Sequence, residues 1–322
     1  MIQYVSLMMK EVNKLDRPLV SVIIPAYNSA GYIGQAVESA LAQTLTDLEV
    51  IVVDDHSSDH TVHVVKQIRD DRLKMYVNEQ NVGPSSTRNL GFQAARGKWI
   101  AVLDSDDWWE PERLSQLVQA AERNKADVIF DDMYYINETE QTPYATFLAM
   151  HDPGIAESGL DTKLSPMHYL DKGYGILQPV FRTEFLRQHH IRYDPDIRNS
   201  EDVGIILDCF LKGAKIWIHP WPYYYYRIRS NSISHVSEAF RYVDPLKMIN
   251  RTLAKVPPDD LDMRLALIRY RKKALLLYRR MRFVHAMKDK KYVEAFLHLH
   301  PTIIPQMVSL SFRKVRRRFY EG

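Results

Sequence analysis

The chain has 322 residues, a length that suits one large domain with an appendage, or two domains. The hydrophobic content of 46% is ordinary for a globular protein, the single Cys209 excludes an internal disulfide framework, and no apolar run reaches the roughly 18 residues of a membrane-spanning helix. The net charge of +3 hides an asymmetry, because residues 264–322 hold 16 Lys and Arg against 3 Asp and Glu, whereas the rest hold 27 against 37. An acidic body with a basic end favours attachment to an anionic surface.

The first hundred residues alternate between short apolar runs and helical patterns. The runs, which are rich in β-branched residues, predict strands at 19–25, 48–53, 73–77 and 99–103, and the segments between them predict helices at 32–41, 61–69 and 84–96. Strands that alternate with helices are typical of βαβ units, in which helices cover both faces of a parallel sheet. We therefore expect an α/β fold with a mostly parallel, Rossmann-like sheet flanked by helices.

Polar residues directly follow each of these strands. The four clusters lie at residues 27–28, 54–55, 81–83 and 104–107. In an open α/β sheet, ligands bind at the carboxyl ends of the strands. The clusters therefore predict a single binding site at that edge.

The last of these clusters is the most acidic. Asp104, Asp106 and Asp107 crowd three carboxylates into four positions after a buried run, where like charges repel and burial without partners is costly. A hard cation such as Mg²⁺ or Mn²⁺, which usually arrives with a substrate phosphate, resolves this conflict. The alternative is a solvated acidic turn in which Asp107 caps a helix that begins at Trp108. The residues alone leave a metal–diphosphate site and a capping turn open.

The second half of the chain has a more mixed pattern. It predicts strands at 127–130, 214–218 and 223–228, a loop over 141–164, a helix beginning near 201, and helices from about 238 to the end with breaks near 257–258 and 301–305. We expect three parts: a charged leader over 1–17 without the features of a signal peptide, a domain over 18–235, and a basic helical C-terminal region over 236–322.

Four motifs in this order resemble glycosyltransferase family 2, whose members have the GT-A fold. The motifs are VSVIIPAYN (20–28), VDDHSSD (53–59), NVGPSSTRN (81–89) and LDSDD (103–107), and the resemblance covers roughly residues 18–235. The stretches at 200–202 and 227–234 match later family signatures more loosely. The resemblance implies transfer of a sugar from a nucleoside diphosphate sugar to an acceptor hydroxyl, with inversion at the anomeric carbon.

The resemblance also implies which residues bind the donor. The expected nucleotide-binding residues are Pro25, Ala26, Tyr27, Asn28, Asp55, Gly83, Arg88, Asp104 and Ser105. Among them, Asp55 should hydrogen-bond the base and Arg88 should lie near the phosphates. Asp106 is the expected ligand of Mn²⁺ or Mg²⁺, with Asp104 and Asp107 as further candidates.

An inverting displacement needs a base on the face opposite the leaving group. The resemblance implies that Asp202 is this base and that Glu201 orients either Asp202 or the acceptor. On the residues alone, two acidic side chains at the start of an apolar helix serve equally well as a cap or as partners of the helix dipole.

A polar segment follows the aromatic strand expected at 223–228. We expect Arg227, Arg229, Ser232 and Ser234 to close over the diphosphate, with His235 as an additional metal ligand. The alternative is an ordinary solvated basic loop. Near the acidic cluster, one ring of the pair Trp108–Trp109 could stack on a sugar, while at least one of them should pack in the core.

The last segment of the chain combines an apolar stripe with cations. Its helical spacing places on one face Ile304, Val308, Phe312, Val315 and Phe319, with arginines beside them. Such a helix suits an anionic membrane surface. Packing on the catalytic domain and self-association into a homo-oligomer are the alternatives, and no nucleic-acid-binding module accompanies the charge.

Taken together, these features predict an inverting, metal-dependent hexosyltransferase. We expect a UDP-sugar donor, a glycan or lipid-linked saccharide acceptor, a role in cell-surface or extracellular polysaccharide assembly, and a peripheral position on the cytoplasmic face of the membrane. Two other functions remain open. One is a non-catalytic sugar-nucleotide-binding or assembly protein on the same fold, and the other is a sugar nucleotidyltransferase, although residues 25–30 lack the Gly-rich basic loop typical of that class.

Overall fold

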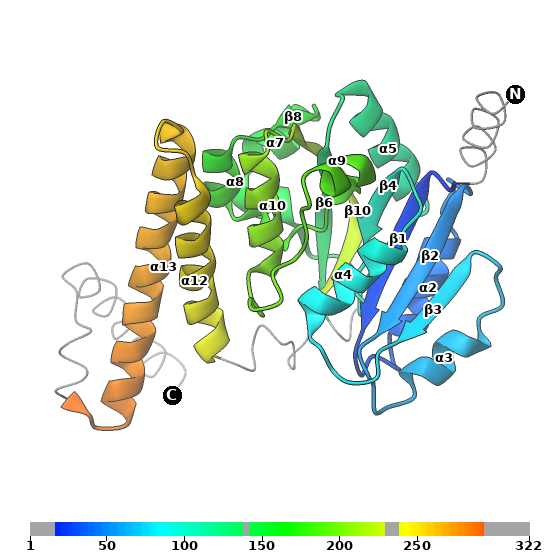
Figure 1. Cartoon of the computed structure of the whole chain (residues 1–322), viewed down its shortest axis with the longest axis horizontal. Helices are drawn as coiled ribbons and strands as arrows, with labels where there is room; N and C mark the ends of the chain where they lie inside the picture. The colour runs from blue at the N-terminus through cyan, green and yellow to red at the C-terminus, as the bar shows by residue number, and fades with distance from the viewer. Residues whose placement is uncertain (1–16, 138–141, 229–237, 293–322) are drawn as a thin grey trace, which may run out of the picture. The chain divides into compact units, whose positions relative to one another are not determined.

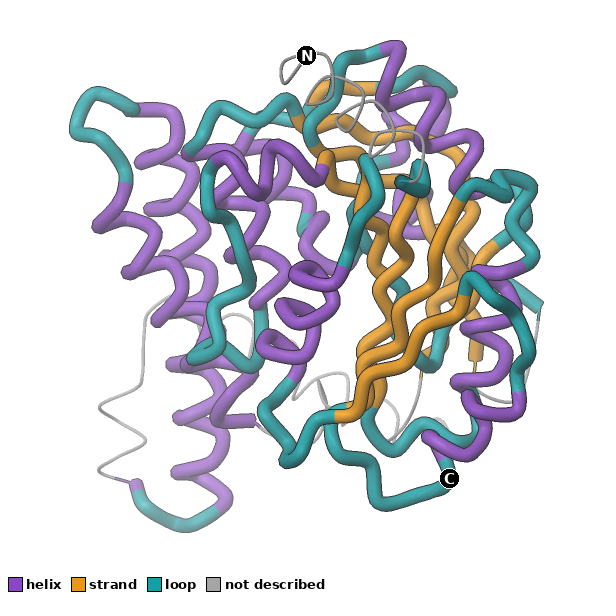
Figure 2. The backbone as a smooth tube through the Cα atoms, turned by 45° about the vertical axis from the view of Figure 1, so that its right-hand side comes forward, coloured by secondary structure: helices purple, strands orange, loops and turns teal. Residues whose placement is uncertain are grey.

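The computed structural model describes residues 17–137, 142–228 and 238–292. The chain divides into two compact units, residues 1–236 and 237–322, and the sheet belongs to the first (Figure 1). Figure 2 shows the strands of this unit side by side with helices around them.

Four parallel strands form the first half of the sheet, in the spatial order β3-β2-β1-β4. They are β1 (Val20–Ala26), β2 (Leu48–Asp54), β3 (Leu73–Val77) and β4 (Trp99–Val102). In β2 and β4 every residue is buried, as expected of parallel strands covered on both faces, whereas β3 at the edge is partly exposed. The strands predicted from the apolar runs are confirmed.

The helices between these strands cover both faces of the sheet. They are α2 (Ile33–Leu41), α3 (Thr61–Gln67) and α4 (Pro84–Ala94). Right-handed crossovers place α4 on the face opposite α2 and α3, because the strand order reverses after β3; Figure 1 shows α4 in front of the sheet. Gly91 lets α4 approach β1 closely, since a Cβ at this position would lie 2.3 Å from Cγ2 of Ile23. Such a reversal of strand order is where ligands bind in open α/β sheets.

The second half of the sheet is mixed. The strand β9 (Val180–Arg182) lies between β4 and β6 (Val128–Asn137) and is antiparallel to both. Next to β6 lies β10 (Ile216–Ile228), which is parallel to it. The short β5 (Trp108–Trp109) pairs antiparallel with β10. The helices of this half include α5 (Arg113–Arg123), α9 (Thr183–Gln188) and α10 (Glu201–Leu211). The predicted fold class, a mostly parallel sheet flanked by helices with a helical C-terminal extension, is confirmed.

Several predicted boundaries in this half are wrong. The segment 141–164 is not a loop, because its described part contains β7 (Ala145–Thr146), α6 (Phe147–His151), α7 (Pro153–Ser158) and β8 (Thr162–Lys163), and α8 (Pro166–Lys172) and the 3₁₀ helix η1 (Tyr174–Ile176) follow. Elements this short have no room for a periodic pattern. The two strands expected at 214–218 and 223–228 are the single strand β10, whose register shifts between His219 and Tyr224.

The described part of the second unit, residues 238–292, contains two helices that pack on each other. They are α12 (Glu238–Lys255) and α13 (Leu261–Lys288), separated by the predicted break at 257–258. The Asp260 side chain caps α13 by accepting a hydrogen bond from Met263 N at 3.0 Å. Among the described residues, no helix is long and apolar enough to cross a bilayer.

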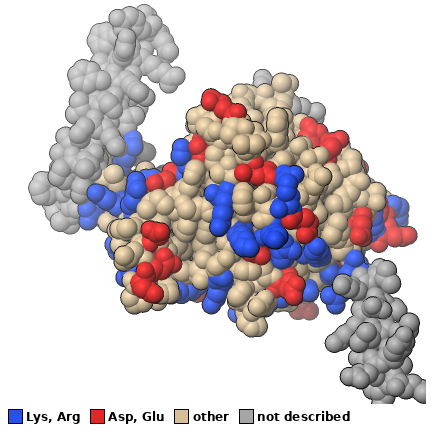
Figure 3. Space-filling view, turned by 90° about the horizontal axis from the view of Figure 1, so that it is seen from above, with Lys and Arg blue, Asp and Glu red and all other residues tan. Residues whose placement is uncertain are grey.

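On the face of the molecule shown in Figure 3, basic side chains lie among acidic ones.

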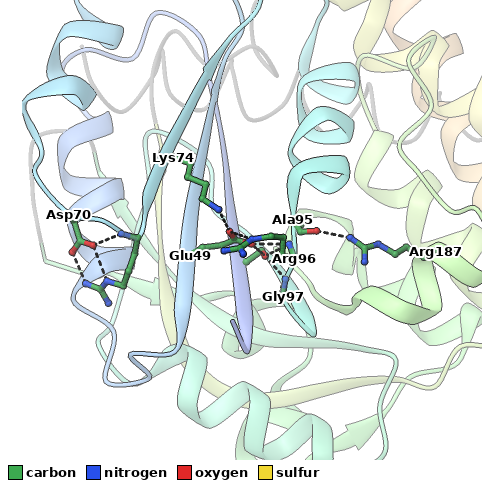
Figure 4. A network of polar contacts seen from close by, with 9 residues as sticks. Glu49, Asp70, Lys74, Ala95, Arg96, Gly97 and Arg187 are labelled. Atoms are coloured by element: carbon green, nitrogen blue, oxygen red, sulfur yellow. Dashed lines mark hydrogen bonds and ion pairs between the residues drawn. The ribbon is translucent and has the colours of Figure 1, made fainter. Parts of the chain in front are cut away.

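A buried carboxylate ties the turn between α4 and β4 to the sheet (Figure 4). Glu49 on β2 is 3% exposed and accepts hydrogen bonds from Ser21 Oγ at 2.7 Å, Lys74 Nζ at 2.7 Å and Arg96 N at 2.8 Å. Burial opposes the charged form, but these hydrogen bonds outweigh it and lower the pKa of Glu49. At Gly97 a Cβ would lie 2.5 Å from Ser21 N, so only glycine fits the turn that leads into β4.

Candidate active site

The loops after β1 and β2 hold each other in a strained conformation. Asn28 and His56 have φ angles of 48° and 63°, in the left-handed region that residues other than glycine rarely adopt. The Asn28 N–H donates to Ser57 Oγ at 2.9 Å, and Asn28 Oδ1 accepts from Ser58 N at 2.9 Å. Such strain persists where the surroundings enforce it and is common at binding sites. Tyr27, beside Asn28, is 50% exposed and free to meet a ligand.

Asp55 shapes the loop that leads into α4. Its Oδ1 accepts from Asn78 Nδ2 and Val82 N, both at 2.9 Å, and its Oδ2 accepts from Gly83 N at 2.8 Å. Gly83 has a φ of 85° and immediately precedes α4, so a glycine is needed there. The structure brings Asp55 and Gly83 together as the motifs suggested, and the contact of Asp55 with a base stays a prediction.

Arg88 on α4 bridges two carboxylates from distant parts of the chain. It is 6% exposed and donates to Asp104 Oδ1 and to Glu201 Oε1, each at 2.9 Å, while its guanidinium carbon lies 5.3 Å from the Tyr193 ring centroid. Both acids therefore lie beside α4 even though one follows β4 and the other begins α10. Burial works against the charged guanidinium, but the surrounding carboxylates raise the pKa of Arg88 well above its usual value.

Glu201 and Asp202 stand in the first turn of α10. Glu201 is buried, and this burial together with the Asp202 charge, opposed by Arg88, raises the pKa of Glu201 to about 7. Burial likewise raises the pKa of Asp202, and Arg88 opposes that shift. Asp202 Oδ1 and the Tyr193 hydroxyl are buried atoms with no hydrogen-bond partner among the described residues. Neither acid acts as the N-cap, since that position is Ser200, with a φ of 71°.

Contacts from α4 fix the segment that leads into α10. Asn89 makes a pair of reciprocal hydrogen bonds with the backbone of Tyr193, Nδ2 to O and N to Oδ1, both at 2.9 Å. Ser85 Oγ donates to Ile197 O at 3.0 Å. The helix that carries Arg88 therefore also positions the two acids of α10.

The three carboxylates after β4 have different surroundings. Asp104 Oδ2 accepts from Gln178 Nε2 at 2.7 Å, so both of its oxygens are engaged. Asp107 is 2% exposed and accepts from Tyr224 Oη at 2.7 Å and from Arg227 N at 2.8 Å. Burial and the neighbouring Asp106 and Asp104 raise the pKa of Asp107 well above its usual value. The alternative in which Asp107 caps a helix is wrong, because β5 follows it and α5 begins only at residue 113.

Arg227 lies within β10 and not in a polar loop. It is 9% exposed, its Nε donates to Asp106 O and its Nη2 to Gln35 Oε1, both at 2.9 Å, and its guanidinium carbon lies 4.7 Å from the Trp108 ring centroid. Trp108 in turn stacks on Tyr225 with centroids 4.9 Å apart, so its ring already packs against protein groups. Arg227 thus holds the backbone of the acidic loop, and the neighbouring Trp109 is in the core as expected.

The carboxylates after β4 differ in their suitability as ligands of a divalent cation. Among the described residues, no group of three or more His, Cys, Asp or Glu side chains is arranged to hold a metal ion. The internal hydrogen bonds of Asp107 count against it as a ligand, and those of Asp104 leave it little freedom. Asp106 is partly exposed. Mg²⁺ and Mn²⁺ are often held by one or two carboxylates plus phosphate oxygens, so a partly exposed carboxylate such as that of Asp106 is compatible with such an ion.

Four predicted site residues lie outside the described part of the chain: Arg229, Ser232, Ser234 and His235. The predicted apolar stripe at 304–319 also lies outside it. Sequence reasoning in turn missed three side chains that shape the site: Gln178, Tyr193 and Tyr224. None of these belongs to a motif. Only the alternation of the strand at 223–228 gave a signal, since it points every second tyrosine inward.

Comparison with known proteins supports the motif assignment. The family model described as "Glycosyl transferase family 2" matches residues 21–169. The succinoglycan biosynthesis protein ExoO of Rhizobium meliloti is 34% identical over 231 residues, which cover 68% of this chain and 63% of ExoO. The Escherichia coli UDP-Glc:alpha-D-GlcNAc-diphosphoundecaprenol beta-1,3-glucosyltransferase WfaP is 38% identical over 120 residues, which cover 37% of this chain and 47% of WfaP. The chain thus spans less than two thirds of these relatives.

A solved structure shares the fold. Staphylococcus aureus TarS 1–349 in complex with UDP-GlcNAc matches with a TM-score of 0.67 and 21% identity, over 87% of this chain and 79% of that one. The motifs, the family model and this fold agree with one another. The chain therefore belongs to glycosyltransferase family 2 and has the GT-A fold.

Proposed function

We propose that this protein transfers a sugar from a nucleoside diphosphate sugar to an acceptor hydroxyl with inversion, and that Asp202 is the general base. The observation that carries the proposal is the environment of Asp202, whose buried Oδ1 has no hydrogen-bond partner among the described residues and whose pKa is raised. Burial makes Asp202 a stronger base than an exposed aspartate, although Arg88 and the Tyr193 hydroxyl oppose part of the shift, so its carboxylate is suited to take a proton.

In the proposed reaction, Asp202 takes the proton of the acceptor hydroxyl as its oxygen bonds to the anomeric carbon. The bond from that carbon to the diphosphate oxygen breaks on the opposite face, which inverts the configuration. Glu201 Oε1 accepts a hydrogen bond from Arg88 at 2.9 Å, so the role of Glu201 is to orient Asp202 and not to take the acceptor proton. Arg88 binds Asp104 and Glu201 at the same time, and its positive charge reduces the repulsion between the two carboxylates.

The diphosphate leaving group develops negative charge as it departs. Mn²⁺ or Mg²⁺ would supply the neutralising charge, with Asp106 as the protein ligand, Asp104 beside it and His235 as an additional candidate. Arg229, Ser232 and Ser234 would contact the same phosphates. Arg227 supports this end of the site through its hydrogen bond to Asp106 O. The nucleotide would lie along Pro25, Ala26, Tyr27, Asn28, Asp55, Gly83 and Ser105.

UDP-sugars are the proposed donors. The structural neighbour TarS is solved with UDP-GlcNAc, and the name of the relative WfaP specifies UDP-Glc as its donor. The relative ExoO is named for succinoglycan biosynthesis, and the WfaP name specifies a diphosphoundecaprenol-linked saccharide as acceptor. These names support a glycan or lipid-linked saccharide acceptor and a role in cell-surface or extracellular polysaccharide assembly.

A lipid-linked acceptor places the enzyme at a membrane surface, and α13 offers a face for it. Leu261, Leu265 and Ile268 recur at helical spacing and are 65%, 54% and 52% exposed. Exposed cations lie beside them at 269 and 271–273. Exposed apolar side chains next to cations fit the interface of an anionic bilayer. We therefore propose peripheral attachment to the cytoplasmic membrane face through the C-terminal region, including the predicted stripe at 304–319.

A donor screen tests the proposed activity. Purified protein with Mn²⁺ or Mg²⁺ should release UDP slowly from UDP-sugars, faster than the corresponding nucleotide from GDP- or dTDP-sugars, and a chelator should stop the release. Release of pyrophosphate from a nucleoside triphosphate and a sugar phosphate would instead identify a nucleotidyltransferase. Binding of UDP-sugars without release or transfer would identify a binding protein.

A further inference from the structure

A continuous path of buried and partly buried polar contacts runs through the site. Arg113 on α5 binds Asp131 on β6 and the backbone of Gln178, which lies just before β9. The Gln178 side chain binds Asp104, and Arg88 in turn binds both Asp104 and Glu201. Every link is between 2.7 and 2.9 Å long. Of the six side chains on this path, five belong to acidic or basic residues, and Gln178 is the neutral one.

The far end of this path is a rigid anchor. Arg113 and Asp131 are 0% and 2% exposed and form two parallel hydrogen bonds, from Nε to Oδ2 at 2.8 Å and from Nη2 to Oδ1 at 2.7 Å. Arg113 Nη2 also donates to the backbone carbonyl of Gln178 at 2.9 Å. The backbone of Gln178 is therefore fixed by a buried bidentate ion pair, a geometry that gives directional precision.

The side chain of Gln178 is held in one orientation by its contact with Asp104. Of the two ends of the Gln178 amide, only the NH₂ group can donate to a carboxylate, so Nε2 faces Asp104 Oδ2, 2.7 Å away. Gln178 is 6% exposed, and its Oε1 is buried with no hydrogen-bond partner among the described residues. A buried acceptor without a partner lowers stability. A side chain that tolerates this loss while orienting Asp104 is better explained by function than by stability.

We infer that Gln178 is a positioning residue that fixes the Asp104 carboxylate for binding of the donor nucleotide. The inference rests on the proposed function, in which Asp104 contacts the nucleotide. Arg88 holds one Asp104 oxygen and Gln178 the other, so the carboxylate has a single orientation before any ligand arrives. Loss of the Gln178 contact would let it turn, and the donor would then have to order it.

The test measures UDP affinity by calorimetry in the presence of Mn²⁺. Gln178→Met keeps the length of the side chain but removes the donor, and it should weaken UDP binding about tenfold or more. Gln178→Glu keeps the shape but places a second carboxylate against Asp104, and it should weaken binding further. Gln43→Met is the matched control, because Gln43 is 3% exposed and also makes buried hydrogen bonds, to Glu110 O and Leu114 N, away from Asp104.

A double-mutant cycle separates positioning from a general structural role. Combined with Asp104→Ala, the change Gln178→Met should have little further effect on UDP affinity, because the group on which it acts is gone. Equal effects of Gln178→Met in both backgrounds, or unchanged affinity in Gln178→Met and Gln178→Glu proteins with wild-type thermal stability, would overturn the inference. Wild-type protein that binds no UDP at all would instead overturn the proposed function.

Discussion

Glu201 and Asp202 are adjacent in the sequence, but their carboxylates have different partners. Glu201 is bound to Arg88, while one oxygen of Asp202 has no partner among the described residues. The motif resemblance pointed to these acids but could not separate their roles, because the difference comes from a side chain 113 positions away in sequence. Gln178 shows the same limit more strongly, since its importance depends on contacts with two residues that are distant in the chain and no motif marks it.

The raised pKa of Glu201 gives a pH dependence of stability. A carboxyl whose pKa is higher in the folded state, here about 7, stabilises the fold below its unfolded value, and this contribution is lost as the pH rises through the folded value. The Glu201→Gln protein has a neutral amide at this position, so its stability does not fall in this way as the pH rises. Relative to wild type, this variant should therefore gain about 1–3 kcal/mol in free energy of unfolding between pH 5 and pH 8. Urea denaturation at both pH values measures it, and a constant difference would contradict the raised pKa.

At the scale of elements, the first half of the sheet was predictable and much of the second was not. Long runs of β-branched residues in strands such as β1 and β2 leave few alternatives, because both faces of these strands are buried. The elements between 145 and 163 have two to six residues each and are defined by their partners in β6 and β10, which the sequence does not reveal. The sequence predicts two strands where the structure has the single strand β10, because prolines interrupt the alternating pattern.

The close packing of α4 on β1 links the fold to the site. In Gly91→Ala the new Cβ would lie 2.3 Å from Ile23 Cγ2, so α4, which carries Arg88, must shift. Such overpacking costs about 1–3 kcal/mol, and the better helix propensity of alanine returns up to about 1 kcal/mol. We expect lower stability and weaker UDP binding, measured by denaturation and calorimetry. Gly154→Ala is the control, because no atom lies within 4 Å of its Cβ; equal behaviour of the two variants would contradict this account.

At the scale of the whole molecule, the charge asymmetry follows the division into two units. The basic residues from 264 onward belong to the second unit, and the predicted nucleotide pocket belongs to the first. If the proposed membrane-held acceptor is correct, attachment through a basic unit would keep the catalytic unit close to its substrate. The helical extension itself was predictable, but its exposed apolar residues on α13 were not, because burial of a helix face depends on its neighbours.

Membrane attachment can be tested by sedimentation with vesicles. Wild-type protein should pellet with phosphatidylcholine vesicles that contain phosphatidylglycerol, and much less with phosphatidylcholine alone. Replacing Leu261, Leu265 and Ile268 together by Gln should reduce pelleting several-fold, because each loses buried apolar area at the interface. The control replaces three exposed residues of the first unit by Gln: Tyr144, Met150 and Leu160. Equal pelleting of the two triple variants would exclude α13 as the membrane face.

The rate of UDP release from the preferred UDP-sugar tests most directly whether Asp202 is the base of a UDP-sugar transfer. Asp202→Asn should lower this rate by about 10²–10⁴-fold while UDP affinity and folding stay near wild type, because only proton transfer is lost. Asp208→Asn on the same helix serves as the control and should keep its activity. Near-wild-type UDP release by a folded Asp202→Asn protein would contradict the assignment.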